Sequence, residues 1–387
     1  MSDYHRYREL SFDVGGQRCT FTTKPGIESW DEPDPATQLL IEVMEIGSND
    51  HVLDLRCGAG LVGLIAAQRA TQGHVYLLDR NVVAVEAARR TMALNEVFNA
   101  EIRLSDCGAA VRGQKFDLVV IHAPRERAVV RQCVRDAATL LRPGGRCYLA
   151  GANRSGVKSA IHYLEDVFGQ AHVLAYKGGS RVALAVKGER VRVDKGMSDE
   201  YYRFRKLIAQ VRGEDHICLT RPGLFSWKEM DEGTRRLVES MEIRPQERVL
   251  DLGCGYGLAG LVAVSMAPRG EVVLVDADCV AVEAARRTME RNEVANAEVL
   301  LSDCGAAVLD RPFDVVITNP PFHQGRGVSY EVANQFILDA AVVLQLGGRL
   351  YLVANRFIPY GQEMDKLFQE VGFAYGDNRF QVWRAIK

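Results

Sequence analysis

The stretch that decides the fold is Arg248–Gly257, which reads RVLDLGCGYG. Its first five residues, Arg248–Leu252, have the pattern of a short buried strand, and the apolar run Leu258–Met266 after the glycines predicts a helix. Glycine permits a tight turn and lets a ligand approach the backbone closely, as in many strand–turn–helix units. Alone, alternating glycines are a weak indication, because nicotinamide enzymes carry similar turns.

The residues that follow alternate between strand and helix patterns. Glu271–Asp276 is Val-rich like a buried strand, and Cys279–Asn292 has apolar residues at helical spacing. Further strands are expected at 297–301, 313–318, 348–354 and 380–386, and a helix at 330–346. Strands that alternate with helices build a doubly wound, mostly parallel sheet. The last strand is expected to close this sheet as a terminal antiparallel hairpin.

The sequence also contains a long internal repeat, whose two copies are offset by 197 residues. Val52–Leu55 repeats as Val249–Leu252 with the same four residues. The same offset relates 84–92 to 281–289 and 105–110 to 302–307. A repeat this long is a duplicated domain, because solenoid repeats recur every ~20–50 residues. The sequence therefore predicts an α/β protein of two tandem Rossmann-like domains, 1–190 and 197–387, joined by the charged stretch 187–200.

A second motif, Asn319-Pro320-Pro321-Phe322, follows the strand expected at 313–318. The Asn319 side-chain carbonyl and the Pro320 backbone carbonyl can accept the two N–H bonds of a planar amino group. Such an amine is a poor nucleophile, and consecutive prolines hold the acceptors in place in advance. Phe322 offers a face on which an extruded base can stack. A plain turn after a strand would explain the prolines, but neither the asparagine nor the aromatic ring.

In this order, the glycine turn and the Asn-Pro-Pro-Phe motif predict methyl transfer from S-adenosylmethionine to a nitrogen on a nucleobase. Asp276 ends the strand after the turn, where an acidic side chain accepts both ribose hydroxyls. Asp303, with Cys304 beside it, follows the third strand, and we expect its carboxylate to accept the exocyclic amine of adenine. The alternative is that Asp303 only caps a helix, since aspartate is favoured there and the first half keeps Asp106-Cys107.

The two halves diverge at both motifs. Arg56 replaces Gly253, Ala59 replaces Tyr256, and His122-Ala123-Pro124-Arg125 replaces the residues 319–322. An arginine thus stands where the backbone is expected to approach the cofactor closely, which is a task for glycine. We therefore expect the first half to keep the scaffold and to have lost the cofactor site. The alternative is that Arg56 points away and the first half still binds cofactor.

At these residues the chain resembles the two-domain ribosomal RNA guanine-N2 methyltransferases, the RsmC and RlmG group of class I methyltransferases, over essentially its whole length. That family has a degenerate first copy, an active second copy with Asn-Pro-Pro-Phe-His, and a Pro-Gly-x-Phe-Ser element before the first core strand. The element is present as Pro222–Ser226, whereas the first half has Glu28 in place of Phe225. The resemblance implies target contacts by 319–322 and cofactor contacts by Phe225, Asp251, Gly253, Gly255, Gly257, Asp276, Asp303, Cys304 and Asn319.

The composition is that of an ordinary globular protein, with 47% hydrophobic and 25% charged residues. No apolar run approaches the ~20 residues of a membrane span, and the N-terminal residues lack a signal-peptide core. The nine cysteines show no Cys-x-x-Cys pair, so we interpret them as buried thiols in a reducing cytoplasm rather than disulfides or metal ligands. The net charge of −2 argues against nonspecific coating of nucleic acid but is compatible with a local basic face.

Together with this composition, the resemblance implies a cytoplasmic monomer, bound to no metal and no membrane, that methylates guanine N2 in ribosomal RNA or a ribosomal subunit. Small-subunit (16S) rRNA is the favoured substrate; large-subunit rRNA, adenine N6 and a protein glutamine amide are alternatives, because all present a planar amino group. An alternative of another class is a non-catalytic RNA-binding assembly factor. The basic and aromatic stretch Tyr201–Lys206 and the loop Gln324–Gly327 suit RNA contacts, and His323 suits a base contact. An exposed strand or helix edge explains Tyr201–Lys206 equally well.

Overall fold

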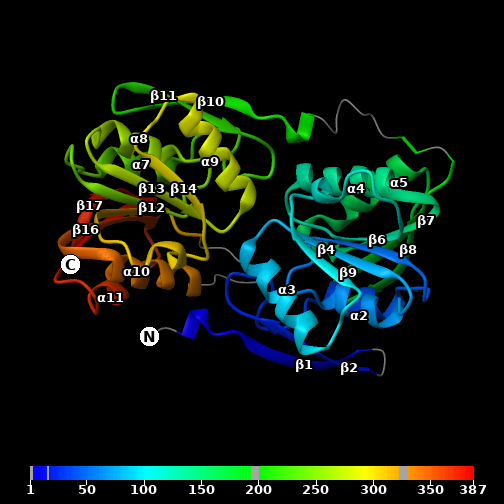
Figure 1. The fold of residues 1–387 in the computed structure, drawn as a ribbon. Coiled ribbons are helices and arrows are strands. Elements are labelled where there is room, and N and C mark those ends of the chain that lie inside the picture. The colour runs from blue at the N-terminus through cyan, green and yellow to red at the C-terminus, as the bar shows by residue number, and fades with distance from the viewer. Residues whose placement is uncertain (1–2, 15–16, 190, 193–199, 322–329) are drawn as a thin grey trace. The chain divides into compact units, whose positions relative to one another are not determined.

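The computed structural model describes residues 3–14, 17–189, 191–192, 200–321 and 330–387. The chain forms two compact units (Figure 1). The first unit is His5–Tyr202, and the second unit is Arg203–Lys387 together with the start of the chain up to Tyr4. The border after Tyr202 lies beyond the linker expected at 187–200, of which residues 190 and 193–199 are outside the described ranges.

The second unit is built on a seven-stranded sheet. Its strands are β12 (Arg248–Leu252), β13 (Glu271–Asp276), β14 (Ala297–Leu301), β15 (Phe313–Thr318), β16 (Leu344–Asn355), β17 (Glu370–Gly376) and β18 (Phe380–Ile386). They follow the order β14-β13-β12-β15-β16-β18-β17, in which the first five are parallel. β18 pairs antiparallel with β16 and β17. The predicted doubly wound sheet with a terminal antiparallel hairpin is therefore confirmed.

Helices cover both faces of this sheet (Figure 1). They are α7 (Glu232–Ser240), α8 (Leu258–Met266), α9 (Cys279–Arg291), α10 (Glu331–Val343) and the short α11 (Gly361–Met364). One hydrophobic cluster joins α7, α8 and α9 to one face, through residues such as Leu237 and Leu261. A second cluster joins α10 and α11 to the other face, through residues such as Phe336 and Met364. Because both faces are buried, the central strands are almost continuously apolar.

A two-stranded hairpin precedes each sheet. In the second unit, β10 (Arg205–Val211) and β11 (Glu214–Thr220) pair antiparallel. This hairpin is fixed to α9, because Leu219 N donates to Thr288 Oγ1 at 3.0 Å and Asn292 Nδ2 donates to Ile217 O at 2.8 Å. The attachment fixes the point from which the Pro222–Ser226 turn leaves β11.

The first unit repeats this architecture. Its strands are β3 (His51–Leu55), β4 (His74–Asp79), β5 (Ala100–Leu104), β6 (Phe116–His122), β7 (Leu141–Ala152), β8 (His172–Lys177) and β9 (Ser180–Val186), and its helices are α1 (Pro35–Val43), α2 (Leu61–Arg69), α3 (Val82–Leu94), α4 (Arg127–Leu140) and α5 (Val157–Phe168). The order β5-β4-β3-β6-β7-β9-β8 matches the second unit strand for strand. Its hairpin, β1 (Arg8–Val14) with β2 (Gln17–Thr23), is tied to α3 by Thr22 N and Thr91 Oγ1 at 2.9 Å. The duplication seen in the sequence is a duplication of the fold.

Most expected elements of the second unit have the bounds that the sequence predicts. β12, α8, β13, β14, β15 and β18 match to the residue. The helix expected at 330–346 is wrong at its end, because α10 stops at Val343 and Leu344 already pairs with Phe313 in the sheet. Leu344 is buried and extended, so packing in the sheet outweighs its good helix propensity. Asn292, expected as the last residue of α9, is its C-cap.

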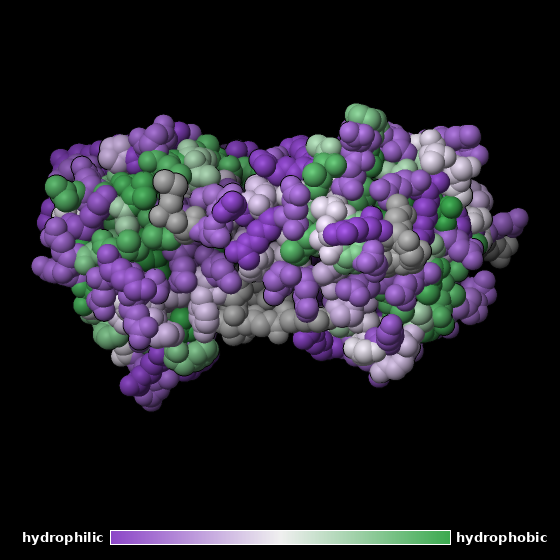
Figure 2. Space-filling model, turned by 90° about the horizontal axis from the view of Figure 1, so that it is seen from below, coloured by the Kyte–Doolittle hydropathy of each residue, from purple (hydrophilic) through white to green (hydrophobic). Residues whose placement is uncertain are grey.

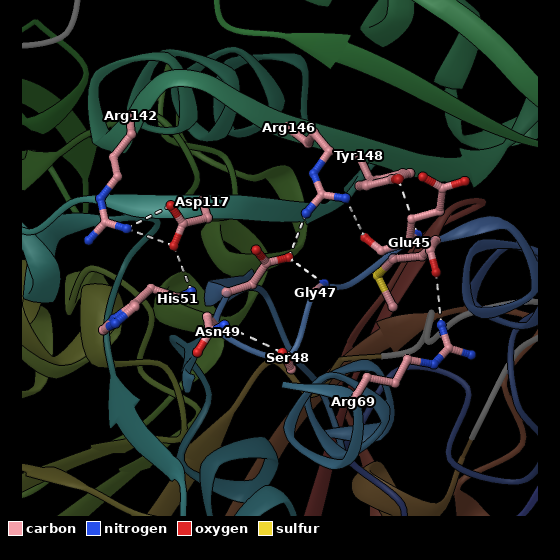
Figure 3. A network of polar contacts seen from close by, with 12 residues as sticks. Glu45, Gly47, Ser48, Asn49, His51, Arg69, Asp117, Arg142, Arg146 and Tyr148 are labelled. Carbon is pink, nitrogen blue, oxygen red and sulfur yellow. Dashed lines mark hydrogen bonds and ion pairs between the residues drawn. The ribbon is translucent and has the colours of Figure 1, made fainter. Parts of the chain in front are cut away.

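Polar contacts hold the edge of the first sheet at which the parallel strands begin (Figure 3). Asp117 accepts from His51 N at 2.8 Å and from Arg142 Nη1 at 2.6 and 2.7 Å. Arg146 donates to Asp50 Oδ2 at 2.5 Å. These bonds join β3, β6 and β7 to one another near their starts, and join β7 to the loop before β3.

The second unit repeats these contacts at the equivalent edge. Asp314 accepts from Arg248 N at 2.8 Å, and Arg349 donates to Glu247 Oε2 at 2.6 Å. In both units, therefore, charged side chains fix the amino ends of the strands, at the opposite end of the sheet from the glycine turns.

The surface mixes hydrophilic and hydrophobic residues. On the face shown in Figure 2, hydrophobic residues occur in several separate areas among hydrophilic ones. Within the described ranges, no helix is long and apolar enough to cross a lipid bilayer. The expectation of buried thiols is confirmed for eight of the nine cysteines, Cys279 being the half-buried one, and all nine are free.

Candidate active site

The candidate site lies where the strand order of the second unit reverses. β12 is flanked by β13 on one side and by β15 on the other, so the loops that leave the carboxyl ends of these strands diverge. In doubly wound sheets ligands bind in the crevice at this point. Thr318, the last residue of β15, donates from Oγ1 to Leu252 O at 2.7 Å. This bond joins the two strand ends, so the glycine turn and Asn319 start side by side.

Backbone hydrogen bonds hold the glycine turn. Gly253 N and Cys254 N donate to Val275 O at 2.9 and 3.0 Å, and Gly257 N donates to Cys254 O at 2.9 Å. Gly253, Gly255 and Gly257 have φ values of 78°, 55° and 85°, which glycine adopts without strain. Gly257 is the N-cap of α8, so the first N–H groups of that helix, which have no partner within the helix itself, start at the turn.

Two of these glycines are needed for different reasons. A Cβ on Gly253 would lie 2.8 Å from Phe336 Cε2, so this glycine makes room for a side chain of α10. A Cβ on Gly255 would meet no described atom within 4 Å. The structure therefore adds contact with Phe336 as a reason for Gly253, and it places the open space for a ligand at Gly255.

Asp276, the last residue of β13, has both carboxylate oxygens fixed by backbone amides. Gly255 N donates to Oδ2 at 2.9 Å, and Asp278 N donates to Oδ1 at 3.0 Å. The half-buried carboxylate is thus held against the open part of the glycine turn. Each carboxylate oxygen has two acceptor positions, so these bonds still permit contact with ligand hydroxyls.

Asp251 is buried in β12 and faces α8. Its Oδ2 accepts from Gly260 N at 2.8 Å. Burial raises the pKa of the Asp251 carboxyl to about 7; the Gly260 N–H acts in the opposite direction, and the Asp276 charge adds to the increase. Asp251 therefore ties the central strand to α8 beneath the glycine turn, a structural contact that its place in the motif did not reveal.

Asp303 follows β14 and is partly exposed. Its Oδ1 accepts from the hydroxyl of Tyr4 at 2.8 Å. The short 3-10 helix that follows, Ala306–Val308, has Gly305 as its N-cap. Helix capping, the alternative reason for an aspartate here, therefore does not account for Asp303.

The loop around Asp303 is fixed by its neighbours. Ser302 Oγ donates to Cys304 O at 2.7 Å and accepts from Ala307 N at 3.0 Å. Gly305 N donates to Asp339 Oδ2 of α10 at 2.8 Å. Cys304 is buried with a φ of 51°, a left-handed conformation that these bonds maintain.

The amide of Asn319 is oriented by the start of α7. Its Nδ2 donates to Thr234 Oγ1 at 2.9 Å and to Asp231 Oδ2 at 3.2 Å. Asp231 is the N-cap of α7 and also accepts from Thr234 N at 2.8 Å. Because Nδ2 is committed to α7, Oδ1 on the other branch of the amide faces away from that helix. This oxygen can accept a hydrogen bond from an amino group in the site.

The other predicted target residues are only partly within the described ranges. Pro320 is buried and Pro321 is exposed. Phe322, His323 and the loop Gln324–Gly327 lie outside the described residues. Phe225 is 62% exposed in the turn after β11, whereas Leu224 beside it is buried.

At the equivalent place, the first unit has a different set of side chains. Arg56 occupies the Gly253 position with a φ of 63°. After the insertion the repeat offset is 203, so the smaller Cys133 stands where the second unit has Phe336. Cys133 is an electrostatic neighbour of Arg56. Burial acts to lower the pKa of the Arg56 guanidinium, but the Asp79 carboxylate and other acidic neighbours raise it overall. Arg56 is therefore an electrostatic neighbour of Asp79, the counterpart of Asp276.

His122, the counterpart of Asn319, contacts a different residue. Its Nε2 lies 3.2 Å from Oδ1 of Asp54, which is fully buried. Burial acts to lower the pKa of His122, but the close, negatively charged carboxylate of Asp54 raises it overall. In the second unit the equivalent acid, Asp251, bonds the backbone of α8 instead. The first unit thus has a histidine paired with a buried aspartate where the second has an oriented amide.

Three residues of the site were missed from the sequence: Tyr4, Asp231 and Thr234. Asp231 stands before a helix as N-caps do, and Tyr4 recurs as Tyr201 at the repeat offset, but neither signal names a partner. The partners lie 85 to 299 residues away. The prediction that Tyr201–Lys206 contacts RNA is wrong for Tyr201, which is 4% exposed and packs in a core.

Comparison with known proteins confirms the resemblance to the RsmC group. The Methyltransferase small domain family matches residues 18–183 and again 215–384. Ribosomal RNA small subunit methyltransferase C of Shewanella amazonensis is 31% identical over 279 residues, 70% of this chain and 78% of that protein. The protein of the same name from Hahella chejuensis is 31% identical over 334 residues, 86% of this chain and 94% of that protein.

A solved structure agrees over nearly the whole chain. It is the T. thermophilus 16S rRNA N2 methyltransferase (RsmC) in complex with AdoMet and guanosine, with a TM-score of 0.84 at 29% identity. The match covers 99% of this chain and 98% of that one. The chain therefore belongs to the methyltransferase small domain family and carries that domain in both of its units.

Proposed function

We propose that the second unit methylates the exocyclic N2 of a guanine in small-subunit ribosomal RNA, with S-adenosylmethionine as the methyl donor. The observation that carries the proposal is the orientation of Asn319. Because its Nδ2 is held by Asp231 and Thr234, its carbonyl oxygen faces away from α7 and can accept an N–H bond. The relatives support the choice of substrate, since RsmC of T. thermophilus was solved with AdoMet and guanosine.

The residues after β15 position the target amine. The amino group of guanine is conjugated with its ring and is a weak nucleophile, so its orientation matters more than a strong base. Asn319 Oδ1 and the Pro320 carbonyl accept its two N–H bonds, and the nitrogen lone pair then points at the methyl carbon. Pro320 is buried and Pro321 follows it, so the acceptors are in place before the base arrives. We infer that Phe322, outside the described residues, stacks on a base that has left its helix.

The residues after β12, β13 and β14 fit the cofactor. S-adenosylmethionine supplies, when bound, an electrophilic methyl carbon attached to a sulfonium. Asp276 is held where its carboxylate can accept the ribose hydroxyls. Asp303 presents a partly exposed carboxylate to the adenine amine, and Gly255 borders the space through which the cofactor reaches the turn.

The first unit, in our proposal, has lost its cofactor site and supports RNA binding. Arg56 replaces a glycine and lies near Asp79, the counterpart of the ribose-binding acid. His122 replaces Asn319 and pairs with Asp54, so no amide is presented to a target amine. We further propose that the protein acts in the cytoplasm as a monomer, on rRNA or on an assembled subunit.

The test of the reaction is to identify the methylated product. The full chain is incubated with tritiated S-adenosylmethionine and either small-subunit RNA, small subunits or large-subunit RNA. The RNA is then digested to nucleosides. N2-methylguanosine from the small-subunit substrates is the expected product. Label in N6-methyladenosine, in large-subunit RNA or in a protein glutamine would replace the substrate assignment, and absence of cofactor binding would favour an assembly factor.

The stoichiometry of cofactor binding tests the division of labour between the units. Isothermal titration of the full chain with S-adenosylhomocysteine should give one site per chain. The variant Asp276→Ala should remove that site, and Asp79→Ala, its match in the first unit, should leave it intact. Two sites per chain, or loss of binding in the Asp79→Ala variant, would contradict the proposal that the first unit has lost its site.

A further inference from the structure

We propose that Tyr4 is a positioning residue for the adenine-binding part of the second unit. The inference rests on the proposed function, because it takes Asp303 as the acceptor of the adenine amine. Tyr4 is 299 residues from Asp303 along the chain, and its hydroxyl donates to Asp303 Oδ1 at 2.8 Å. The next residue, His5, already belongs to the first unit. The second unit therefore takes one residue of its cofactor site from the far end of the chain.

Packing fixes the place of the Tyr4 hydroxyl. Tyr4 is 5% exposed and belongs to the hydrophobic cluster that contains Cys304 and Phe336. Burial, with the nearby Cys304 thiol and the Asp303 carboxylate, raises the pKa of the Tyr4 hydroxyl far above its ordinary value. The hydroxyl thus stays protonated, and it is a donor at a fixed position to which Asp303 adjusts.

Tyr4 acts on the side chain of Asp303 and not on its backbone. The loop backbone is already fixed by Ser302 and by the bond from Gly305 N to Asp339. On a fixed backbone, an aspartate still has three staggered χ1 positions. The bond from Tyr4 selects one of them. Because a carboxylate oxygen has two acceptor positions and Oδ2 is a second oxygen, the selected rotamer can still accept the amine of adenine.

The first unit contains the same contact in a different setting. Tyr201, the repeat counterpart of Tyr4, donates to Asp106 Oδ1 at 3.3 Å. Tyr201 comes just before the second unit in the chain but packs in the core of the first. Tyr4 comes just before the first unit but packs in the second. Asp106 is buried, whereas Asp303 is partly exposed. Of these two carboxylates, the one in the second unit is the one that a ligand can reach.

Two matched variants of the full chain test the inference. Tyr4→Phe keeps the buried ring and removes only the donor, and Tyr201→Phe makes the same change in the first unit. Isothermal titration compares S-adenosylhomocysteine with S-inosylhomocysteine, which has a carbonyl where adenine has its amino group. We expect Tyr4→Phe to bind S-adenosylhomocysteine about tenfold more weakly, a loss within the range of one hydrogen bond to a charged group. Its affinity for S-inosylhomocysteine stays unchanged, and Tyr201→Phe changes neither affinity.

The outcomes separate a positioning role from a structural one. Unchanged affinity for S-adenosylhomocysteine in Tyr4→Phe overturns the inference, and so does an equal loss for both ligands, because general loosening of the unit affects both. In an Asp303→Asn background, Tyr4→Phe should have no further effect; another tenfold loss there also contradicts the inference. If the unaltered chain binds no S-adenosylhomocysteine at all, the proposed function itself fails, and this inference falls with it.

Discussion

The variant Asn319→Ala separates catalysis from folding and from cofactor binding. It removes the carbonyl that is proposed to accept one N–H bond of the target amine, and it leaves the Pro320 carbonyl in place. It also removes the donor to Thr234 and Asp231. The expected result is a folded protein that binds cofactor normally and transfers methyl groups very slowly.

The structure sets the size of both effects. Asp231 keeps the N–H of Thr234 at 2.8 Å and its hydroxyl at 3.2 Å, so the N-cap of α7 survives. The loss of stability is then about two ordinary hydrogen bonds, ~1–3 kcal/mol, or a melting temperature lower by about 2–12 °C. Removal of one preorganised hydrogen-bonding group at a reacting centre typically lowers the rate by about 100- to 1000-fold, ~3–4 kcal/mol.

The assay is single-turnover methyl transfer to small-subunit RNA, together with titration of S-adenosylhomocysteine. We expect Asn319→Ala to lose about 100-fold or more in rate and to keep its cofactor affinity within about threefold, less than ~0.7 kcal/mol. His122→Asn, at the matching position of the first unit, is the control and should leave the rate unchanged. The reasoning is refuted if Asn319→Ala transfers methyl groups at a rate close to that of the unaltered chain, or if its cofactor affinity falls as far as its rate.

Three further changes test other contacts. Asp231→Asn keeps the helix cap but removes the charge that holds the Asn319 amide, so single-turnover rates should fall by about tenfold, ~1.4 kcal/mol, while Asp34→Asn in the first unit has no effect. Gly253→Ala should destabilise the second unit by ~2–4 kcal/mol in urea unfolding, because left-handed strain adds to contact with Phe336; Phe336→Cys should recover part of the loss. The raised pKa of Asp251 means that its contribution to stability is complete below about pH 3.9 and is lost as the pH rises through about 7. The melting temperature of the unaltered chain should therefore fall between about pH 5.5 and about pH 8.5, and that of Asp251→Asn should fall less.

The fold was predictable because its signals are local and are repeated. Arg248–Leu252 and Leu258–Met266 have the expected bounds because a buried strand, a glycine turn and an apolar helix each have a short-range pattern. The prediction failed at Leu344–Leu346, where leucine suits a helix but pairing with Phe313 decides the conformation. A pattern of apolar residues cannot show where a helix ends because the next residues pair in a sheet.

For the candidate site, the placement of the backbone was more predictable than the side-chain contacts. The motif placed Gly255, Asp276 and Asn319 at strand ends, and the topology brings those ends together. Asp231, which holds the Asn319 amide, and Tyr4, which bonds Asp303, are brought to the site by packing between distant segments, which no local pattern records. The divergence of the first half was visible at Arg56, but the proximity of Cys133 to Arg56 appears only in the folded structure.

The two tyrosine–aspartate contacts, Tyr4–Asp303 and Tyr201–Asp106, can form at different times during translation. Tyr201 is made 95 residues after Asp106, so the first unit can be completed as soon as that tyrosine emerges. Tyr4 is made 299 residues before Asp303. At ~5–20 residues per second, it waits about 15–60 s for its partner. Tyr4 is therefore without this partner while a whole domain is synthesised, and the contact between the two residues can form only after β14 has been made.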